Sequence, residues 1–417
     1  MGTVRDLAER LWTGVDSTET LNPLTTFAGL EELSDGVAFV SSFANVSAFD
    51  TTDGLVLVDT GGFMAAGGVY TSLRGWTDKP LHTAVYTHGH VDHVFGVRRF
   101  DEEAVDRGWS RPVVLAHEAL PPRFDRYKLT AGYNAAINAR QFRIPNLSWP
   151  TDYRYPDRTY RDHLEVEVGG VRFELHHDRG ETDDHTWVYV PAHRVLCAGD
   201  LFIWASPNCG NPQKVQRYPK EWAHALDKMR ALDAEILLPG HGPPILGADR
   251  VALALSETAE LLHTVHDRTL ALMNQGKSLD AVMHEIELPR HLLERPYLRP
   301  VYDDPAFIVR NIWRLYGGWY DGNPARLKPA SDHAIAREVL ALAGGVDAVI
   351  ARARELAELG DPAACQLAEW AWQAAPEDAQ VREVRALVYD RRASAETSLM
   401  ARSIYAAAVA EARARRE

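Results

Sequence analysis

The chain has 417 residues, of which 46% are hydrophobic, and a formal net charge of −13. This length favours two domains with substantial cores. The acidic balance argues against a nucleic-acid partner, because binding to a phosphate backbone uses clustered Lys and Arg side chains. Three scattered cysteines, no apolar stretch long enough to span a bilayer and no signal-peptide pattern at the first residues together predict a cytoplasmic protein without a membrane partner.

Short strands dominate the pattern from about residue 36 to residue 243. A strand, a turn at Asp53-Gly54 and a second strand are predicted over residues 36–62. Further strands are predicted at the sequences HTAVYTH, PVVLAH, VRFELHH, TWVYVP, RVLCAGD and EILLPGH. The last two end in a polar residue that follows a glycine, so they bring polar side chains to the end of an apolar strand.

The composition becomes helical after Ala248, where apolar residues recur at three- and four-residue spacing. From Ser331 onward the chain is rich in Ala, Glu and Arg, and the pattern predicts paired helices stacked in a tetratricopeptide-like manner. We therefore predict a β-rich domain over residues 1–247, a helical extension and linker over 248–330, and an all-α domain over 331–417.

Residues 88–93 contain three histidines and one aspartate, in the sequence THGHVDH. His88 and His90 lie two residues apart at the end of a predicted strand, so their side chains can face the same metal ion. Asp92 and His93 follow after the chain has turned, and they can face a second ion. Imidazole and carboxylate ligands suit zinc, and also iron or manganese.

This pattern resembles the T-H-x-H-x-D-H signature of the metallo-β-lactamase superfamily. The other marks of that superfamily follow in order, with Asp59 in LVLVDTG, Asp200 in CAGD and His241 in LLPGHG. The resemblance implies an αββα sandwich with a dinuclear zinc site at one edge. It also implies that Asp59 lies near the site, that Asp200 bridges the two ions and that His241 is the last ligand.

One ligand position departs from the common form of the superfamily. Where a third histidine is usual, the sequence RGETDDH places Glu181, and His185 competes for the role. A glutamate there resembles the alkylsulfatase-like branch, in which the bridging carboxylate is usually Glu rather than the Asp200 found here. The resemblance implies one ion on His88, His90 and Glu181 and another on Asp92, His93 and His241, with Asp92 and Asp200 as catalytic residues.

The resemblance covers most of residues 35–412 and implies that the helical tail is a dimerisation domain, so we expect a homodimer. Larger members of this branch carry a further sterol-carrier-like domain that recruits greasy substrates. No segment of this sequence matches that domain, and we therefore expect a substrate with a short or polar organic part.

Residues 123–146 are rich in Arg, Tyr and Asn and resemble the stretch that lines the anion pocket in the alkylsulfatase-like branch. Tyr133, Asn134 and Arg140 are the predicted substrate-binding residues, and Arg217 is a second anion-binding candidate. An ordinary amphipathic helix with a solvated basic face is an equally good interpretation of this stretch. No histidine lies between Asp200 and His224, so the leaving-group acid of the family is missing, moved or unnecessary.

The first functional hypothesis is a dinuclear zinc hydrolase that cleaves a sulfate ester, or a similar small anionic ester, with a metal-bound hydroxide. The alternative is a hydrolase of the same fold that acts on a carboxylic ester, thioester, lactone or lactam. An iron-dependent redox enzyme and a non-catalytic helical adaptor are two further hypotheses. The sequence does not indicate whether the S–O or the C–O bond breaks.

Overall fold

The structure is a computed structural model that describes residues 3–25 and 27–414. Its first sheet has seven strands in chain order. They are β1 (Gly29–Ser34), β2 (Val37–Ser41), β3 (Val46–Thr51), β4 (Gly54–Val58), β5 (Leu81–Val85), β6 (Val113–His117) and β7 (Arg158–Tyr160). Strands β1 to β4 pair antiparallel, whereas β4 to β7 pair parallel. The parallel strands therefore end at the same edge of the sheet.

The second sheet has six strands in the order β13-β12-β11-β10-β9-β8. They are β8 (His163–Val168), β9 (Val171–His177), β10 (Thr186–Val190), β11 (Val195–Ile203), β12 (Ile236–His241) and β13 (Ile245–Leu246). Among them β11 and β12 pair parallel, and the other neighbours pair antiparallel. The polar ends of β11 and β12 consequently lie side by side.

Helices account for most of the remaining elements of the described chain. They are α1 (Val4–Trp12), α2 (Ala66–Trp76), α3 (Val97–Arg107), α4 (Leu120–Leu129), α5 (Ala131–Phe142), α6 (Pro219–Arg230), α7 (Ala248–Asn274), α8 (Leu279–Glu285), α9 (Arg290–Leu293), α10 (Pro305–Gly317), α11 (Asp332–Ala343), α12 (Val346–Glu358), α13 (Ala363–Ala374), α14 (Ala379–Ala395) and α15 (Leu399–Arg413). Two short 3-10 helices span Pro191–His193 and Pro324–Arg326. No helix in the described part of the chain is both long and apolar enough to cross a membrane.

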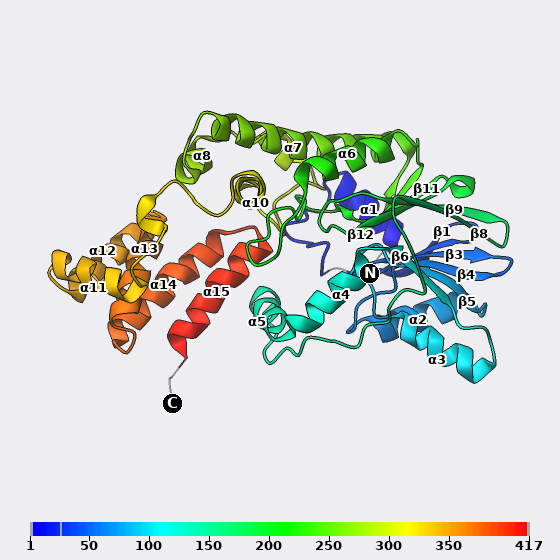
Figure 1. Cartoon of the computed structure of the whole chain (residues 1–417), viewed down its shortest axis with the longest axis horizontal. Coiled ribbons are helices and arrows are strands. Elements are labelled where there is room, and N and C mark those ends of the chain that lie inside the picture. Colours follow the sequence, from blue (N-terminus) through cyan, green and yellow to red (C-terminus); the bar gives the residue numbers. More distant parts are fainter. Residues whose placement is uncertain (1–2, 26, 415–417) are drawn as a thin grey trace. The chain divides into compact units, whose positions relative to one another are not determined.

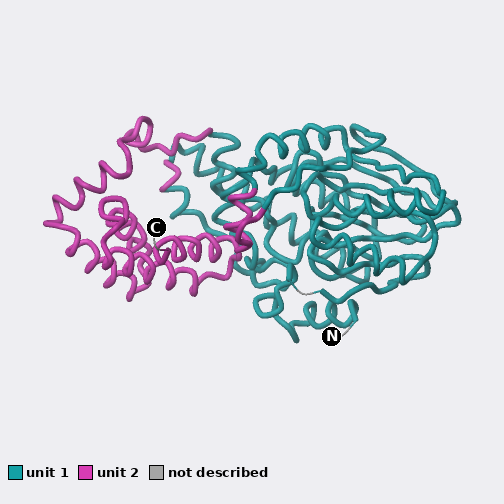
Figure 2. Tube along the Cα trace, turned by 90° about the horizontal axis from the view of Figure 1, so that it is seen from below, with its two compact units in different colours: residues 1–134, 148–277, 281–317 teal, residues 135–147, 278–280, 318–417 magenta. Residues whose placement is uncertain are grey.

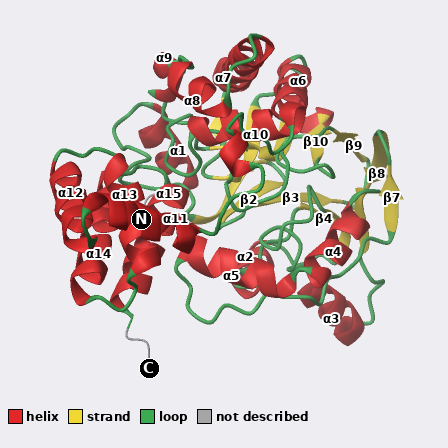
Figure 3. Ribbon diagram, turned by 60° about the vertical axis from the view of Figure 1, so that its left-hand side comes forward, coloured by secondary structure: helices red, strands yellow, loops and turns green. Residues whose placement is uncertain are grey.

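The two sheets pack face to face, and helices cover their outer faces (Figure 3). Strand β10 shows why, because its side chains alternate between two cores. Val188 points into the core between the sheets, where it joins Phe39 of the first sheet. Trp187 points the other way and packs with Trp222 of α6. On the far side, α2, α3 and α4 cover the first sheet. This layering confirms the predicted αββα sandwich.

The predicted unit over residues 36–62 contains three strands rather than two, because the chain turns again at residues 42–45. Asn45 makes this turn, since its Oδ1 accepts a hydrogen bond from the backbone N of Ser42 at 3.2 Å. Its Nδ2 donates to the carbonyl oxygens of Pro239 and Gly242 at 3.0 and 2.8 Å. A side chain from the first sheet therefore fixes the end of β12, near the last predicted ligand. The turn at Asp53-Gly54 lies where it was predicted, between β3 and β4.

The chain divides into two compact units, coloured separately in Figure 2. The first comprises residues 1–134, 148–277 and 281–317, and the second comprises residues 135–147, 278–280 and 318–417. Within the second unit, helices α11 to α14 form a small all-helical core around residues such as Ile350, Ala368 and Val384 (Figure 1). Helix α15 packs on α14 through a separate cluster. The predicted division at residues 247 and 330 stays a prediction.

Candidate metal centre

The predicted ligands come from the ends of strands and from the loops that follow them. His88 follows β5 by three residues, and the chain through His93 runs on to α3. Asp200 lies within β11, and His241 is the last residue of the neighbouring parallel strand β12. Glu181 lies in the loop between β9 and β10. The two sheets thus deliver ligands from separate parts of the sequence to one place.

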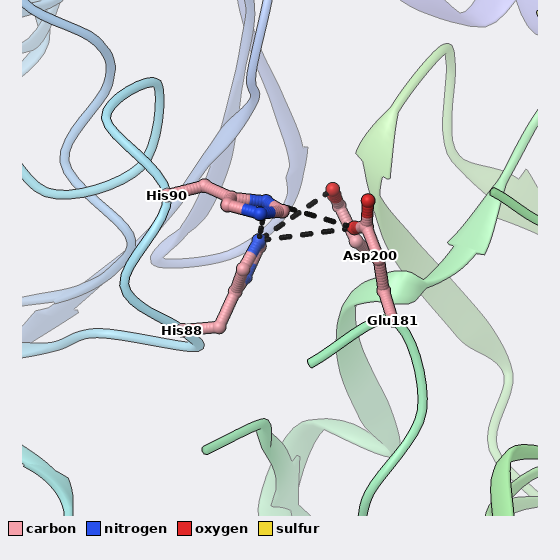
Figure 4. Close-up of side chains that lie close together, drawn as sticks. All are labelled: His88, His90, Glu181 and Asp200. Carbon is pink, nitrogen blue, oxygen red and sulfur yellow. Dashed lines mark hydrogen bonds and ion pairs between the residues drawn. The ribbon is translucent and has the colours of Figure 1, made fainter. Parts of the chain in front are cut away.

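These side chains form two groups whose potential ligand atoms lie within 4.8 Å of one another. One group contains His88, His90, Glu181 and Asp200, whose side chains converge in Figure 4. In this group Nε2 of His88 lies 3.9 Å from Oε2 of Glu181, and Nδ1 of His90 lies 3.8 Å from the same oxygen. The second group contains Asp92, His93 and His241.

The carboxylate of Asp200 lies between the two groups. Its Oδ2 is 3.6 Å from Nε2 of His88, in the first group. Its Oδ1 is 3.4 Å from Nε2 of His93 and 3.4 Å from Nε2 of His241, in the second group. One oxygen therefore faces each group, as a carboxylate that bridges two metal ions requires.

Several atoms at this site are buried without a hydrogen-bond partner among the described residues. They are Nε2 of His93, Oε2 of Glu181 and Oδ1 of Asp200. Such atoms are costly to bury unless something binds them. Oε2 of Glu181 faces the first group, whereas Nε2 of His93 and Oδ1 of Asp200 face the second. This donor set fits a metal ion of the kind that prefers nitrogen and oxygen ligands.

The pKa values of two of these side chains also indicate that the site lacks a positive charge. Burial, together with the charge of Asp200, raises the pKa of Glu181 well above its usual value. Burial opposes protonation of His93, but Asp200 and Asp59 raise its pKa well above the usual value. Both shifts favour the protonated form of the side chain. A bound metal ion would act in the opposite direction, because ligands must lose their protons to bind it.

Contacts behind the histidines fix which ring nitrogen faces each group. Nδ1 of His93 lies 2.7 Å from Oδ2 of Asp59, and Nδ1 of His241 contacts the carbonyl oxygen of Phe43. Asp59 also accepts hydrogen bonds from the backbone N and the hydroxyl of Thr87, both at 2.8 Å. Partners of this kind orient metal-binding histidines and keep Nε2 available as the ligand atom. Asp59 thus lies near the site, as the sequence predicted.

Comparisons with known proteins agree with this architecture. Residues 41–241 match the metallo-beta-lactamase superfamily, and residues 278–415 match the alkyl sulfatase dimerisation family. A linear primary-alkylsulfatase from Pseudomonas sp. is 30% identical over 381 residues, which cover 85% of this chain and 71% of the relative. The protein belongs to the alkylsulfatase family.

Other alkylsulfatases are similar over a comparable length. An (R)-specific secondary-alkylsulfatase from Pseudomonas sp. is 27% identical, and the alignment covers 83% of this chain but only 58% of that relative. The solved structure of a stereoselective inverting sec-alkylsulfatase from Pseudomonas sp. superposes with a TM-score of 0.83 at 25% identity, over 92% of this chain and 66% of the other. The chain thus spans about three fifths to seven tenths of the length of these relatives.

Glu181 and His185, the two candidates for one ligand position, make different contacts in this alkylsulfatase-family protein. Nε2 of His185 accepts a hydrogen bond from the backbone N of Asp200 at 3.1 Å. The His185 ring also stacks on the ring of His88, with centroids 4.9 Å apart. His185 therefore supports two ligands from behind, whereas Glu181 places an oxygen inside the ligand group.

Arg217 contacts the metal ligands rather than an open pocket. Its guanidinium is buried, and Nη2 lies 3.1 Å from Oε1 of Glu181. Its Nε donates to the carbonyl oxygen of Asn208 at 2.9 Å, and its Nη1 donates to that of Val215 at 3.1 Å. A substrate anion would have to compete with these acceptors. The contacts assign Arg217 to holding Glu181, and its role in substrate binding stays a prediction.

The other predicted substrate-binding residues are not gathered among the ligands. The side chain of Tyr133 is 64% exposed. The amide Nδ2 of Asn134 donates to the carbonyl oxygen and the hydroxyl of Thr130, at 3.0 and 2.8 Å. Arg140 is exposed and belongs to the second compact unit. The roles of these three residues in substrate binding stay predictions.

Two residues that the sequence analysis did not select share the electrostatic environment of the ligands. Burial, reinforced by Arg217, lowers the pKa of Lys214 to about 7, although Asp92 and Glu181 act to raise it. Burial raises the pKa of the Tyr302 hydroxyl well above its usual value, and Glu181, Asp92 and Asp200 add to this effect. Lys214 lies three residues before Arg217, so a search for cations near that arginine would have found it. Tyr302 is too far along the chain to be linked to the site by spacing.

Proposed function

We propose that the protein is a dinuclear zinc hydrolase that cleaves a sulfuric ester. The observation that carries this proposal is the position of Asp200, whose two carboxylate oxygens face separate groups of metal-binding side chains. Membership of the alkylsulfatase family supports the choice of a sulfuric ester. When two zinc ions are bound, they would supply a water of lowered pKa as the nucleophile and polarise an ester oxygen.

The residues of this chain have distinct parts in the proposed site. His88, His90 and Glu181 hold one ion, while Asp92, His93 and His241 hold the other. Asp200 spans both groups and fixes their separation. The neutral form of His88 suits its part, because burial and the neighbouring His93 and His90 hold its pKa well below the usual value.

The substrate anion needs a positive partner close to the ligands. We propose Lys214 as the side chain that orients the sulfate group, because it lies within the electrostatic reach of the ligands Asp92 and Glu181. Its Nζ lies 5.8 Å from the ring centre of Trp149, and the charges of Asp92 and Glu181 act on it. An anion bound there would lie beside carboxylates that belong to both ligand groups.

A second candidate function is hydrolysis of a thioester at the same site. The observation that favours it is a further relative, an acyl-coenzyme A thioesterase from Gallus gallus, which is 25% identical over 48% of this chain. The metal ligands would be the same, and the group that binds the substrate would differ.

The test is a substrate panel on one preparation. The purified protein is stripped of metal with a chelator, reloaded with zinc, and assayed with short and long alkyl sulfates, an acyl thioester and a lactone. We expect release of inorganic sulfate that depends on zinc and exceeds hydrolysis of the other substrates. Faster cleavage of the thioester or the lactone, with no sulfate released, would favour the alternative. Products formed in isotopically labelled water would then show whether the S–O or the C–O bond breaks.

A further inference from the structure

Gly89 separates the ligands His88 and His90, and its peptide group has a charged partner. The backbone N of Gly89 donates to Oδ2 of Asp184 at 2.9 Å. Asp184 is completely buried. A Cβ atom on Gly89 would lie 2.8 Å from Cδ of Arg123 and 3.2 Å from Oδ2 of Asp184, so both side chains pack directly against this peptide. The turn that carries two ligands therefore lies on an Arg–Asp pair.

The pair itself is buried and comes from elements outside the ligand motif. Nε of Arg123, on α4, lies 2.8 Å from Oδ1 of Asp184. Arg123 is only 4% exposed. A second contact of Arg123 reaches Asp183, whose side chain is 42% exposed. A buried carboxylate requires a partner of this kind, because removing one charge of a buried pair leaves the other uncompensated.

The loop that contains Asp184 supplies one ligand of the first group and contacts the segments that carry the other three. Glu181 is itself a ligand, Asp184 binds the peptide between His88 and His90, and His185 accepts a hydrogen bond from the backbone of Asp200. In the second group, Asp59 contacts His93, and the carbonyl oxygen of Phe43 contacts His241. Asp59 also reaches the first group, because the Thr87 hydroxyl that donates to it lies 3.0 Å from Nδ1 of His88. The contact of Asp184 with the Gly89 peptide is made to the first group, and neither Arg123 nor Asp184 is itself a member of a ligand group.

We propose that Asp184, held by Arg123, is a positioning residue that sets the affinity of the His88–His90–Glu181 group for its metal ion. The inference rests on the proposed function, since it requires that both groups bind metal. Asp184 acts by orienting the Gly89 peptide, and through it the directions of the two imidazole rings. Loss of the Asp184 charge frees the turn at Gly89. His88 and His90 then remain at the site, but their rings are no longer held in the directions that metal binding requires.

The test is a stepwise metal titration of the full chain. Metal-free protein is titrated with cobalt, whose absorption reports each site, and then with zinc against a chelating indicator. The variant Asp184→Asn keeps the size of the side chain and removes the charge that pairs with Arg123. We expect one of the two binding constants to fall by about 10- to 100-fold, the range found when a partner behind a metal ligand is lost. The other constant should remain unchanged.

Asp183→Asn is the matched control. It removes a carboxylate from the adjacent position, one that also contacts Arg123 but is exposed and has no described contact with Gly89. This variant should retain both binding constants. Thermal unfolding of the metal-free proteins verifies that each variant is folded. Should Asp184→Asn fail to fold, Arg123→Lys repeats the test, because lysine keeps the charge but cannot reproduce the geometry of the Nε contact.

The possible results separate the inference from the function on which it rests. Equal loss at both sites, no loss at either site, or the same loss in Asp183→Asn would overturn the positioning role and leave the proposed function intact. Wild-type protein that binds no metal ion would reject both.

Discussion

At the scale of single residues, Glu181 occupies the position at which the common form of the superfamily has histidine. Its Oε2 is aimed at His88 and His90, and its Oε1 is held by Arg217. The motif spacing predicted His88, His90, Asp92 and His93, and the family resemblance implied Glu181, Asp200 and His241; the structure brings these seven residues into two groups. Neither could predict that Arg217 supports Glu181, since that contact joins two loops that are 36 residues apart.

Replacing Glu181 by glutamine should weaken one of the two sites selectively. The amide has the same size but lacks the charge that binds a cation, and it disrupts the pair with Arg217. We expect metal bound to the His88 and His90 group to be lost first, and kcat/KM for a sulfate ester to fall by about 100-fold or more, as for removal of a charged partner at a buried site. Metal content and kinetics measured together provide the check. A variant that retains two tightly bound ions and full activity would show that Glu181 is not a ligand.

The pKa of Lys214 predicts how affinity for an anionic substrate depends on pH. Because lysine carries its charge below its pKa, a value of about 7 means that Lys214 is charged at slightly acid pH and neutral at alkaline pH. KM for a sulfate ester should therefore rise as the pH increases through 7. In Lys214→Met, KM at acid pH should be about tenfold higher than in the wild type, which corresponds to a loss of roughly 1.4 kcal/mol of binding free energy. The rise of KM with pH should be absent in this variant.

Lys220→Met is the comparison for that experiment. Lys220 lies nearby in sequence, in the first turn of α6, and it is exposed. Its loss should leave both KM and the pH profile unchanged. A Lys214→Met variant with the wild-type profile would exclude this lysine from substrate binding.

At the scale of secondary-structure elements, the site depends on the close approach of the parallel strands β11 and β12. The sequence predicted both strands. Strand β12 ends at the expected His241, whereas β11 continues past Asp200 to Ile203. Over residues 36–62 the sequence predicted a strand, a turn and a second strand. This prediction missed the turn at residues 42–45 that separates β2 from β3. The missed signal is Asn45, which accepts a local hydrogen bond from Ser42 and donates two more to Pro239 and Gly242. The latter two form only when the ends of the two sheets are brought together.

Gly240 allows β12 to pass directly beside the bridging carboxylate. A Cβ atom at this position would lie 2.0 Å from Oδ1 of Asp200 and 2.8 Å from the carbonyl carbon of Gly199. Gly240→Ala should displace Asp200 from both ligand groups, so metal binding and activity should be lost together. The overpacking should also lower the free energy of unfolding by about 1–3 kcal/mol.

Gly75→Ala provides the contrasting case for that prediction. Gly75 lies in α2, where an added Cβ would meet nothing within 4 Å. Alanine there should raise the free energy of unfolding by about 0.5–1 kcal/mol, because glycine in a helix interior is unfavourable. Metal content should not change. If Gly240→Ala binds two ions as tightly as Gly75→Ala, the close approach of β12 to the Asp200 carboxylate is not needed for metal binding.

At the scale of the whole molecule, the helical tail matches the alkyl sulfatase dimerisation family. The repeating apolar pattern predicted helices from residue 331 onward, and five are present there, α11 to α15. It could not distinguish apolar residues that pack within the tail from those that remain at the surface. Ile350 and Trp372 are buried in the core of the helical unit, whereas Leu342 is 91% exposed in the single chain.

We therefore predict a homodimer that uses part of the exposed apolar surface of the second unit. Light scattering at micromolar concentration should give about twice the mass of one chain, because an obligate dimer persists well above its dissociation constant. Leu342→Asp places a charge on that surface and should shift the equilibrium toward the monomer. A wild-type mass of one chain under these conditions would contradict the homodimer.

We propose that one chain holds two metal ions that share Asp200. The most direct measurement is the number of zinc ions per chain after exhaustive reloading of metal-free protein and removal of free zinc, compared between the wild type and Asp200→Asn. We predict two ions per chain in the wild type and weakened binding of both in the variant, because each oxygen of this carboxylate faces a separate ligand group. A single ion per chain in the wild type, or loss of only one ion in Asp200→Asn, would contradict the bridged pair.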